Sequence, residues 1–282
     1  MPMDFRPPTP LEHFACLVRQ DSSLPLLEAA VCLGQQVQAD LDVQAVLCQV
    51  DAWAQRLRQQ LPWGASPLQR AQLLNMFFYE RLGFAANAND YGHADNSYVH
   101  RVVQTRRGIP ITLAVLWMEL AMAIGLKVEG VSFPGHFLVK LHVPEGLIIQ
   151  DPLTGQGLTS QTLGEWLEPH RESWGLSEDE MAPLHLFLQP ASASEIVERM
   201  LRNLRAVYQR DADTVQELQV LHRLLQLQPC SWELYRDRGM LRAQVGERAA
   251  ALEDLQTYAR NASAPHDLLL VEAHIEGLRA GV

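Results

Sequence analysis

Residues 107–155 decide the fold, and they read RGIPITLAVLWMELAMAIGLKVEGVSFPGHFLVKLHVPEGLIIQDPLTG. The segment from Pro110 to Ile124 is apolar on nearly every side of a helix, because only Thr112 and Glu119 are polar. A helix of this kind lies in the middle of a core rather than on a surface. Proline suits the first helical turn. We therefore expect a central, buried helix over residues 110–124.

After Gly125 the hydrophobic pattern alternates with the period of a strand. Three segments show it, at residues 127–133, 136–143 and 147–150, and the last two are separated by Pro-Glu-Gly. Because they follow one another closely, we expect an antiparallel meander. The sequence thus predicts an α+β fold that is mostly helical, with a small antiparallel sheet.

The segments before the central helix predict helices without strands. Residues 9–88 show helical spacing throughout, with Thr9, Asp42 and Ser66 as N-caps. Residues 85–96 are rich in Asn, Asp and Gly and predict a loop. A short helix is expected over residues 98–104, capped by Asn96 or Ser97. After the sheet, Ser160 or Thr162 is expected to cap another that runs to Trp166.

From Ser194 onward the pattern is helical again and has a repeat of 34 residues. The units 198–231 and 232–265 match tetratricopeptide repeats in part, with Gly239 where such a repeat has a small residue. We expect a first domain over residues 1–190 and helical repeats over residues 194–282. Two incomplete repeats do not bury both faces, so we expect them to dock on the first domain.

Composition excludes several classes of function. The 282 residues carry a formal net charge of −10, which argues against nucleic-acid binding. No apolar run is long enough for a membrane span, and the first residues lack the apolar segment of a signal peptide. Four scattered cysteines without a CxxC pair fit a reducing compartment. We expect a cytoplasmic protein that needs no cofactor.

A helix start, a histidine and an aspartate follow one another in the central stretch. Thiol enzymes use this order: a thiol at the helix start, His136 as base, and Asp151 to orient the histidine. The same two residues are equally compatible with a purely structural pair. The pattern alone leaves both interpretations open.

The motifs of this region resemble those of the SirB invasion-regulator type of transglutaminase-like protein. The resemblance implies a papain/transglutaminase-like core followed by tetratricopeptide-like helices, and it covers roughly residues 25–280. The segments that carry it are Asn96-Ser97-Tyr98, Arg107-Gly108-Ile109-Pro110-Ile111-Thr112-Leu113, Phe133-Pro134-Gly135-His136-Phe137-Leu138-Val139, and Asp151-Pro152 with Gly155.

Carried over residue by residue, the resemblance gives His136 and Asp151 the roles of catalytic histidine and aspartate. The position of the nucleophilic cysteine is occupied by Pro110, which has no nucleophile. This departure is itself typical of the SirB type. The residues that the resemblance suggests for ligand binding are Asn96, Arg107, Gly108, Pro110 and Gly135.

Other groups offer alternatives for the missing nucleophile. Thr112 lies two residues beyond Pro110, although a threonine in a first helical turn more often bonds to the backbone. An activated water is a second alternative, and Cys16, Cys32 or Cys48 would have to reach the site from other helices. A metal site would draw on His93, Asp95, His100, His136 and Asp151, but no recognised spacing supports one, and we predict none.

Three further features allow more than one interpretation. Arg106 and Arg107 form either a solvated pair or an anion clamp beside the helix start. Glu119 either pairs with an arginine, reaches solvent, or is an acid of raised pKa. Tryptophans at 166, 174 and 232 share no spacing, which favours packing over a ligand cage.

The functional expectation is a regulatory or binding protein. Its degenerate cleft would hold a peptide or small ligand, and its repeats would hold a protein or peptide partner. The alternative is a hydrolase or acyl-transferring enzyme that uses His136 and Asp151 with Thr112 or water. A third possibility is a structural role in which the two residues tie the sheet together.

Overall fold

The computed structural model describes residues 8–19, 23–170, 184–262 and 265–280. The chain forms two compact units, Asp21–Met200 and a second made of Met1–Gln20 with Leu201–Val282. These boundaries differ from the expected division between residues 190 and 194. Helix α1 (Pro10–Leu17) packs on α10 (Thr214–Leu227), and helix α9 (Ala193–Arg210) runs through the boundary. The expected docking of the repeats stays a prediction.

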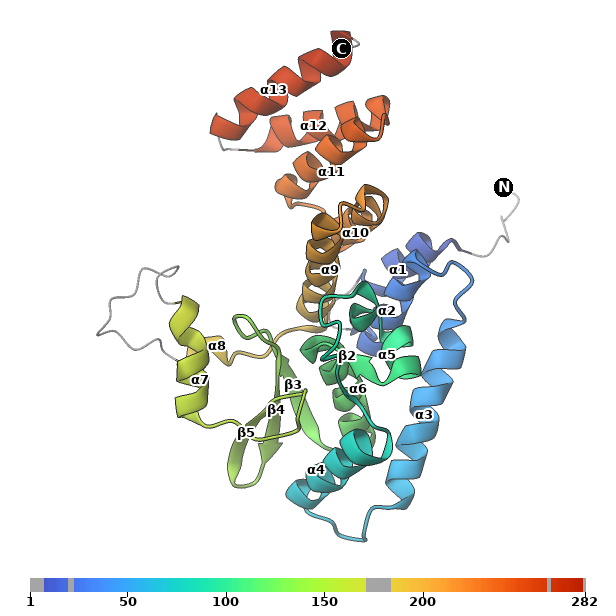
Figure 1. Ribbon diagram of the computed structural model, residues 1–282, viewed down its shortest axis with the longest axis vertical. Helices are drawn as coiled ribbons and strands as arrows, with labels where there is room; N and C mark the ends of the chain where they lie inside the picture. Colours follow the sequence, from blue (N-terminus) through green and yellow to red (C-terminus); the bar gives the residue numbers. More distant parts are fainter. Residues whose placement is uncertain (1–7, 20–22, 171–183, 263–264, 281–282) are drawn as a thin grey trace. The chain divides into compact units, whose positions relative to one another are not determined.

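The unit Asp21–Met200 contains most of the predicted elements (Figure 1). Asp42 and Ser66 cap their helices as expected, and Thr9 caps α1. The helical segments of this unit are α2 (Leu26–Cys32), η2 (Leu33–Gln36), α3 (Val43–Gln59), α4 (Pro67–Asn75), the π-helical turn η3 (Met76–Arg81), η4 (Ala94–Ser97), α5 (Val99–Thr105), α6 (Pro110–Ala123), α7 (Ser160–Leu167), η5 (Glu168–His170) and α8 (Leu184–Phe187).

Helix α6 is the centre of this unit, as its sequence predicts. Helices α2, α3, α4 and α5 and two strands of the sheet pack against it. Leu113, Leu116, Trp117 and Leu120 are all fully buried. Each buried leucine contributes about 2 kcal/mol through removal of apolar surface from water. The helix therefore forms a rigid support for the elements around it.

The predicted meander is confirmed. Strands β3 (Lys127–Val131), β4 (Leu138–Val143) and β5 (Gly146–Gln150) pair antiparallel in that order. The first two are shorter than expected, because residues 132–137 form the connecting turn. Val131 and Leu138 pack with Leu163 and Leu167 of α7. Residues of β3 and β4 also lie near α6, so the sheet is held between helices.

Three local predictions are wrong. Strand β1 (Ala85–Ala86) pairs in parallel with β2 (Arg107–Gly108), where no strand was expected, since two paired residues leave no periodic signal. Thr159 caps α7 in place of Ser160 or Thr162. Helix α5 begins after Tyr98 without a side-chain cap, because Asn96 is used elsewhere.

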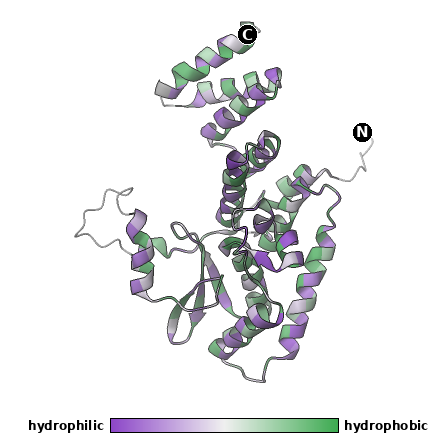
Figure 2. Ribbon diagram, in the orientation of Figure 1, coloured by the Kyte–Doolittle hydropathy of each residue, from purple (hydrophilic) through white to green (hydrophobic). Residues whose placement is uncertain are grey.

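The second unit consists of paired helices, as the 34-residue period predicts. After α10 come α11 (Trp232–Gln244), α12 (Arg248–Asn261) and α13 (Pro265–Ala280), each packed on the one before. Figure 2 shows both hydrophilic and hydrophobic residues in each of these helices. A side chain at Gly239 would approach Leu255 of α12 to 2.8 Å. The small residue expected there lets α11 and α12 pack closely.

Candidate functional site

His136 and Asp151 are hydrogen-bonded. His136 Nε2 lies 3.0 Å from Asp151 Oδ1, and 17% of the histidine side chain is exposed. A carboxylate only accepts hydrogen bonds, so Nε2 donates, and in the neutral ring Nδ1 keeps the free lone pair. Nδ1 is thus the nitrogen suited to accept a proton or a ligand's hydrogen bond.

The turn after β5 fixes the Asp151 carboxylate. Oδ1 accepts the Leu153 amide at 2.9 Å, and Oδ2 accepts the Thr154 hydroxyl at 3.2 Å. Burial alone would raise the pKa of Asp151. The hydrogen bond from His136, the Leu153 amide, the histidine charge and the Thr154 hydroxyl outweigh it, and the pKa lies below its ordinary value. The carboxylate stays ionised and orients the imidazole.

A tight turn presents His136. Gly135 has φ +67°, a conformation that glycine adopts without strain, and the His136 amide donates to Phe133 O at 3.1 Å. Arg199 of α9 braces this turn. Its guanidinium donates to Ser132 Oγ at 3.0 Å and to His136 O at 3.4 Å. Gly135, predicted as a binding residue, shapes the turn that carries the histidine.

A polar network lies behind Asp151. Asn75 Nδ2 donates to Gly155 O at 3.0 Å, and its Oδ1 accepts Trp117 Nε1 of α6 at 2.8 Å. Tyr79 of η3 donates to Pro152 O at 3.0 Å. The π-helical turn, a feature frequent at functional sites, begins directly after Asn75. Asn75 and Tyr79 therefore tie the aspartate turn to the central helix.

An aromatic ring packs against the histidine. The Trp166 ring meets the His136 ring edge-on, with centroids 4.8 Å apart and planes at 70°. Burial, and next the charge of Asp151, raise the pKa of Tyr91, whose side chain is exposed. Trp166 thus packs, as expected, but against the histidine itself. Trp174 lies outside the described residues.

The start of α6 is closed by its own hydrogen bonds. Pro110 is buried at the first helical position. The Thr112 hydroxyl is fully buried, lies 2.8 Å from Asn96 O and 3.0 Å from Ile109 O, and accepts the Ile109 amide at 3.1 Å. Threonine at this position thus bonds to the backbone. These contacts argue against Thr112 as a nucleophile.

The other predicted binding residues position backbone. Asn96 is buried, and its Nδ2 donates to Asp90 O at 2.6 Å and Tyr91 O at 3.1 Å, which holds the loop that carries Tyr91. Gly108 is buried where a side chain would approach Thr112 Oγ1 to 2.8 Å. Arg107 Nη1 donates to Gly83 O at 2.7 Å. Asn96, Gly108 and Thr112 come together, whereas the described bonds of Arg107 are to the backbone.

The structure also bears on the anion clamp, the metal site and the cysteines that the sequence offered as alternatives. The Arg106 guanidinium lies 4.4 Å from the centre of the Trp53 ring, a cation–π contact rather than an anion clamp. Among the described residues, no three histidine, cysteine, aspartate or glutamate side chains are grouped to hold a metal ion. His100 is fully buried, and within the described part of the chain neither ring nitrogen has a hydrogen-bond partner. Cys32 is buried, and Cys16 and Cys48 are exposed.

Sequence reasoning missed Asn75, Tyr79, Tyr91 and Arg199. Asn75 is a polar residue on an otherwise apolar helix face, which was the one available signal. The other three reach the site through tertiary packing or a π-helical turn, and neither of these two features leaves a recognisable pattern in the sequence. The site therefore extends further than the motifs that predicted it.

The sequence profiles of two known families match this chain. The sequence profile of the "Transglutaminase-like superfamily" matches residues 44–202, more than half of the chain. The chain belongs to this superfamily. A "Tetratricopeptide repeat" profile matches residues 204–276, so the superfamily domain is followed by tetratricopeptide helices. The expected fold class is confirmed.

Bacterial relatives cover most of the chain. A "UPF0162 protein" of Xylella fastidiosa is 35% identical over 263 residues, 92% of this chain and 91% of that protein. "Protein SirB1" of Salmonella typhimurium is 23% identical over 242 residues, 84% of this chain and 86% of that protein. The resemblance to the SirB type is thereby confirmed. No solved structure matches this chain.

Proposed function

We propose that this protein is a regulatory or binding protein, built on a transglutaminase-like domain in which Pro110 occupies the place of the nucleophile. The observation that supports this most is the contrast between the His136–Asp151 pair and the start of α6. His136 and Asp151 keep an oriented acid–base geometry, whereas the Thr112 hydroxyl at the helix start is committed to backbone groups. The pair would then bind a ligand's polar group through Nδ1 rather than activate a nucleophile.

The repeats supply the second part of the proposal. Tetratricopeptide repeats generally mediate protein–protein interaction. We propose that α10 to α13 hold a protein or peptide partner, and that the His136 site holds a peptide or small ligand. None of the described helices has the length and apolar character needed to cross a membrane. A cytoplasmic location is part of this proposal.

Turnover and binding assays test the proposal together. The purified protein is assayed with p-nitrophenyl acyl esters and peptide amides, and a displayed library of random peptides is selected against it. We expect no turnover above that of H136A, and selected site-binding peptides that lose at least about tenfold in affinity in H136A. H274A, which changes an exposed histidine of α13, is the matched control and should bind like the wild type.

The alternatives predict other results. Turnover that is lost in H136A and D151N but kept in H274A would establish the enzyme alternative, with water as the attacking group. A loss of thermal stability in H136A with unchanged peptide affinity would show that the pair is structural.

A further inference from the structure

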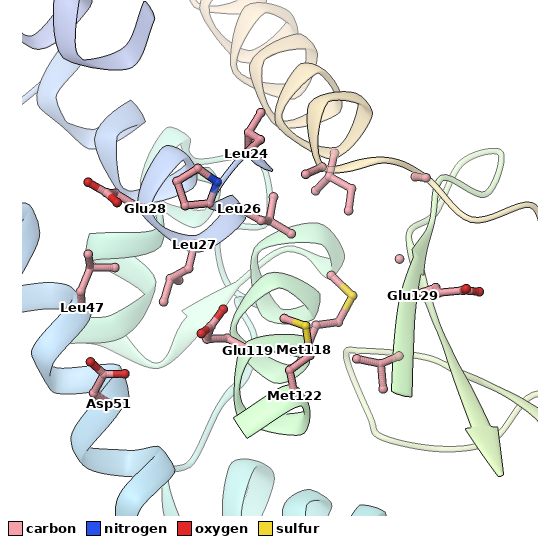
Figure 3. A pocket seen from close by; sticks show the side chains of 16 residues that line it. Leu24, Leu26, Leu27, Glu28, Leu47, Asp51, Met118, Glu119, Met122 and Glu129 are labelled. Atoms are coloured by element: carbon pink, nitrogen blue, oxygen red, sulfur yellow. The ribbon is translucent and has the colours of Figure 1, made fainter. Parts of the chain in front are cut away.

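A cavity of about 610 Å³ lies beside α6 and is lined in part by Met118, Glu119 and Met122 of that helix. Figure 3 shows it among the start of α2, helix α3, helix α6 and strand β3, with the first turn of α9 beside them. None of its lining residues belongs to the His136–Asp151 site. Its volume is that of a small-molecule site.

Most of the cavity wall is apolar. Leu26 and Leu27 of α2, Met118 and Met122 of α6, and Ile196 of α9 line it. Methionine is unbranched and polarisable, so it adapts to ligands of irregular shape. Met122 is 51% exposed, so this wall reaches solvent. A ligand with an apolar body thus has both a surface to contact and a way in.

The charged groups of the cavity are carboxylates. Asp51, Glu119, Glu28 and Glu129 line it, and no described lining residue is cationic. Figure 3 shows Glu119 directed from α6 toward the side where Leu27 and Asp51 lie. Burial raises the pKa of Glu119, and the charge of Asp51 raises it further. The two carboxylates that line the cavity therefore repel each other.

Glu129 gives an internal comparison. Its carboxylate lies 3.3 Å from Lys140 Nζ and 3.0 Å from His142 Nε2. Burial raises the pKa of Glu129, but the hydrogen bonds and charges of these two partners outweigh burial and lower that pKa. In Figure 3 it points away from the cavity. The chain thus compensates one of its carboxylates with its own cations, whereas the one charge that shifts the pKa of Glu119 among the described residues is the like charge of Asp51.

We propose that this cavity binds a small organic cation with an apolar body, an alkylammonium-type amine. Its head group would lie between Glu119 and Asp51, and its chain would lie against the leucines and methionines. A cation relieves the repulsion of the two carboxylates, an anion adds to it, and a neutral ligand leaves it unchanged. This proposal is independent of the proposed function, since it uses none of the same side chains.

Titration calorimetry with n-hexylammonium at pH 7 tests the proposal. We expect a dissociation constant of about 1 mM, which is reasonable for a ligand of seven heavy atoms. Hexanol and hexanoate, of the same length, should bind at least about tenfold more weakly. E119Q should weaken the binding of hexylammonium by about tenfold, and the double change D51N/E119Q should weaken it further. E145Q removes an exposed carboxylate of the β4–β5 turn and should bind within twofold of the wild type, roughly.

Several outcomes would overturn the proposal. They are equal binding of hexanol, equal binding by E119Q, or no binding at about 20 mM hexylammonium. Thermal unfolding shows whether E119Q is folded, and we expect no loss of stability because the change removes a repelled carboxylate. H136A should bind hexylammonium normally, so failure here and failure of the proposed function are distinguishable.

Discussion

The two halves of the candidate site differ in how their polar groups are used. On the sheet side, His136 is partly exposed and Asp151 is buried, and the bond between Nε2 and the carboxylate leaves Nδ1 outside the pair. On the helix side, Pro110 is buried and the Thr112 hydroxyl is saturated by backbone groups. We propose that the fold keeps this acid–base geometry while its nucleophile position has become part of the packing. The following changes probe that difference.

Gly155→Ala should have the largest effect, because it disrupts the sheet side. Gly155 has φ +73°, and an added Cβ would lie 2.4 Å from the Tyr79 ring. Backbone strain and overpacking together should lower the free energy of unfolding by about 4 kcal/mol. Urea unfolding measures it. Gly157→Ala is the control, since its Cβ would meet only Ile148 at 3.7 Å, and an equal loss in both variants would contradict the account.

His100 sharpens the comparison, because it is a histidine of the same unit whose ring nitrogens have no hydrogen-bond partner among the described residues. Burial first, and the charge of Arg101 second, lower its pKa from 6.5 to about 4 against the opposing charge of Asp95. The unfolded chain therefore binds the proton more tightly. Stability should fall as the pH drops from about 6.5 to about 4, by on the order of 3 kcal/mol from this residue.

His100→Leu should remove this part of the pH dependence. Urea unfolding at several pH values measures it. An unchanged slope between pH 6.5 and pH 4 in the variant would show that His100 is not buried in its neutral form.

Thr112→Val tests the helix side. The change keeps the shape but removes the hydroxyl that bonds Asn96 O and the Ile109 amide, and we expect a loss of about 2 kcal/mol in unfolding free energy. Thr112→Ser keeps the hydroxyl and should recover most of it. If Thr112 were a nucleophile in an open site, valine would cost little stability, and that result would count against the closed helix start.

Arg199→Gln should have the smallest effect, because its bonds support only the turn before His136. Loss of the bonds to Ser132 Oγ and His136 O should lower the unfolding free energy by about 1 kcal/mol. Arg202→Gln, an exposed arginine of the same helix, is the control and should change stability by less than about 0.5 kcal/mol. Equal effects of the two variants would show that Arg199 does not brace the turn.

The sequence predicted the features with a strong period and missed those without one. Helix α6, the meander and the paired repeat helices follow from hydrophobic spacing, and Asp42, Ser66 and Thr9 cap as expected. The two-residue strands β1 and β2 give no such signal. Their parallel pairing depends on how the chain folds back, which no local pattern encodes.

The site was predicted in part for the same reason. His136 and Asp151 meet as their order suggested, because both follow from the turn before β4 and the end of β5. Asn75 and Tyr79 lie far from them in sequence and reach Gly155 and Pro152 only through tertiary packing. Sequence motifs therefore reveal His136 and Asp151, whereas the residues that position them become visible only in the fold.

We propose that Pro110 stands where a nucleophile would face His136, and a cysteine placed there tests this most directly. Pro110→Cys is made in a chain whose exposed Cys16, Cys48 and Cys230 are serine, so that only buried Cys32 remains. The rate of alkylation by iodoacetamide is measured at pH 6, with and without His136→Ala. A helix start and a histidine both lower a thiol pKa. We predict alkylation at least about tenfold faster with His136 present. Equal rates would contradict the claim, because they would show that residue 110 does not face the histidine.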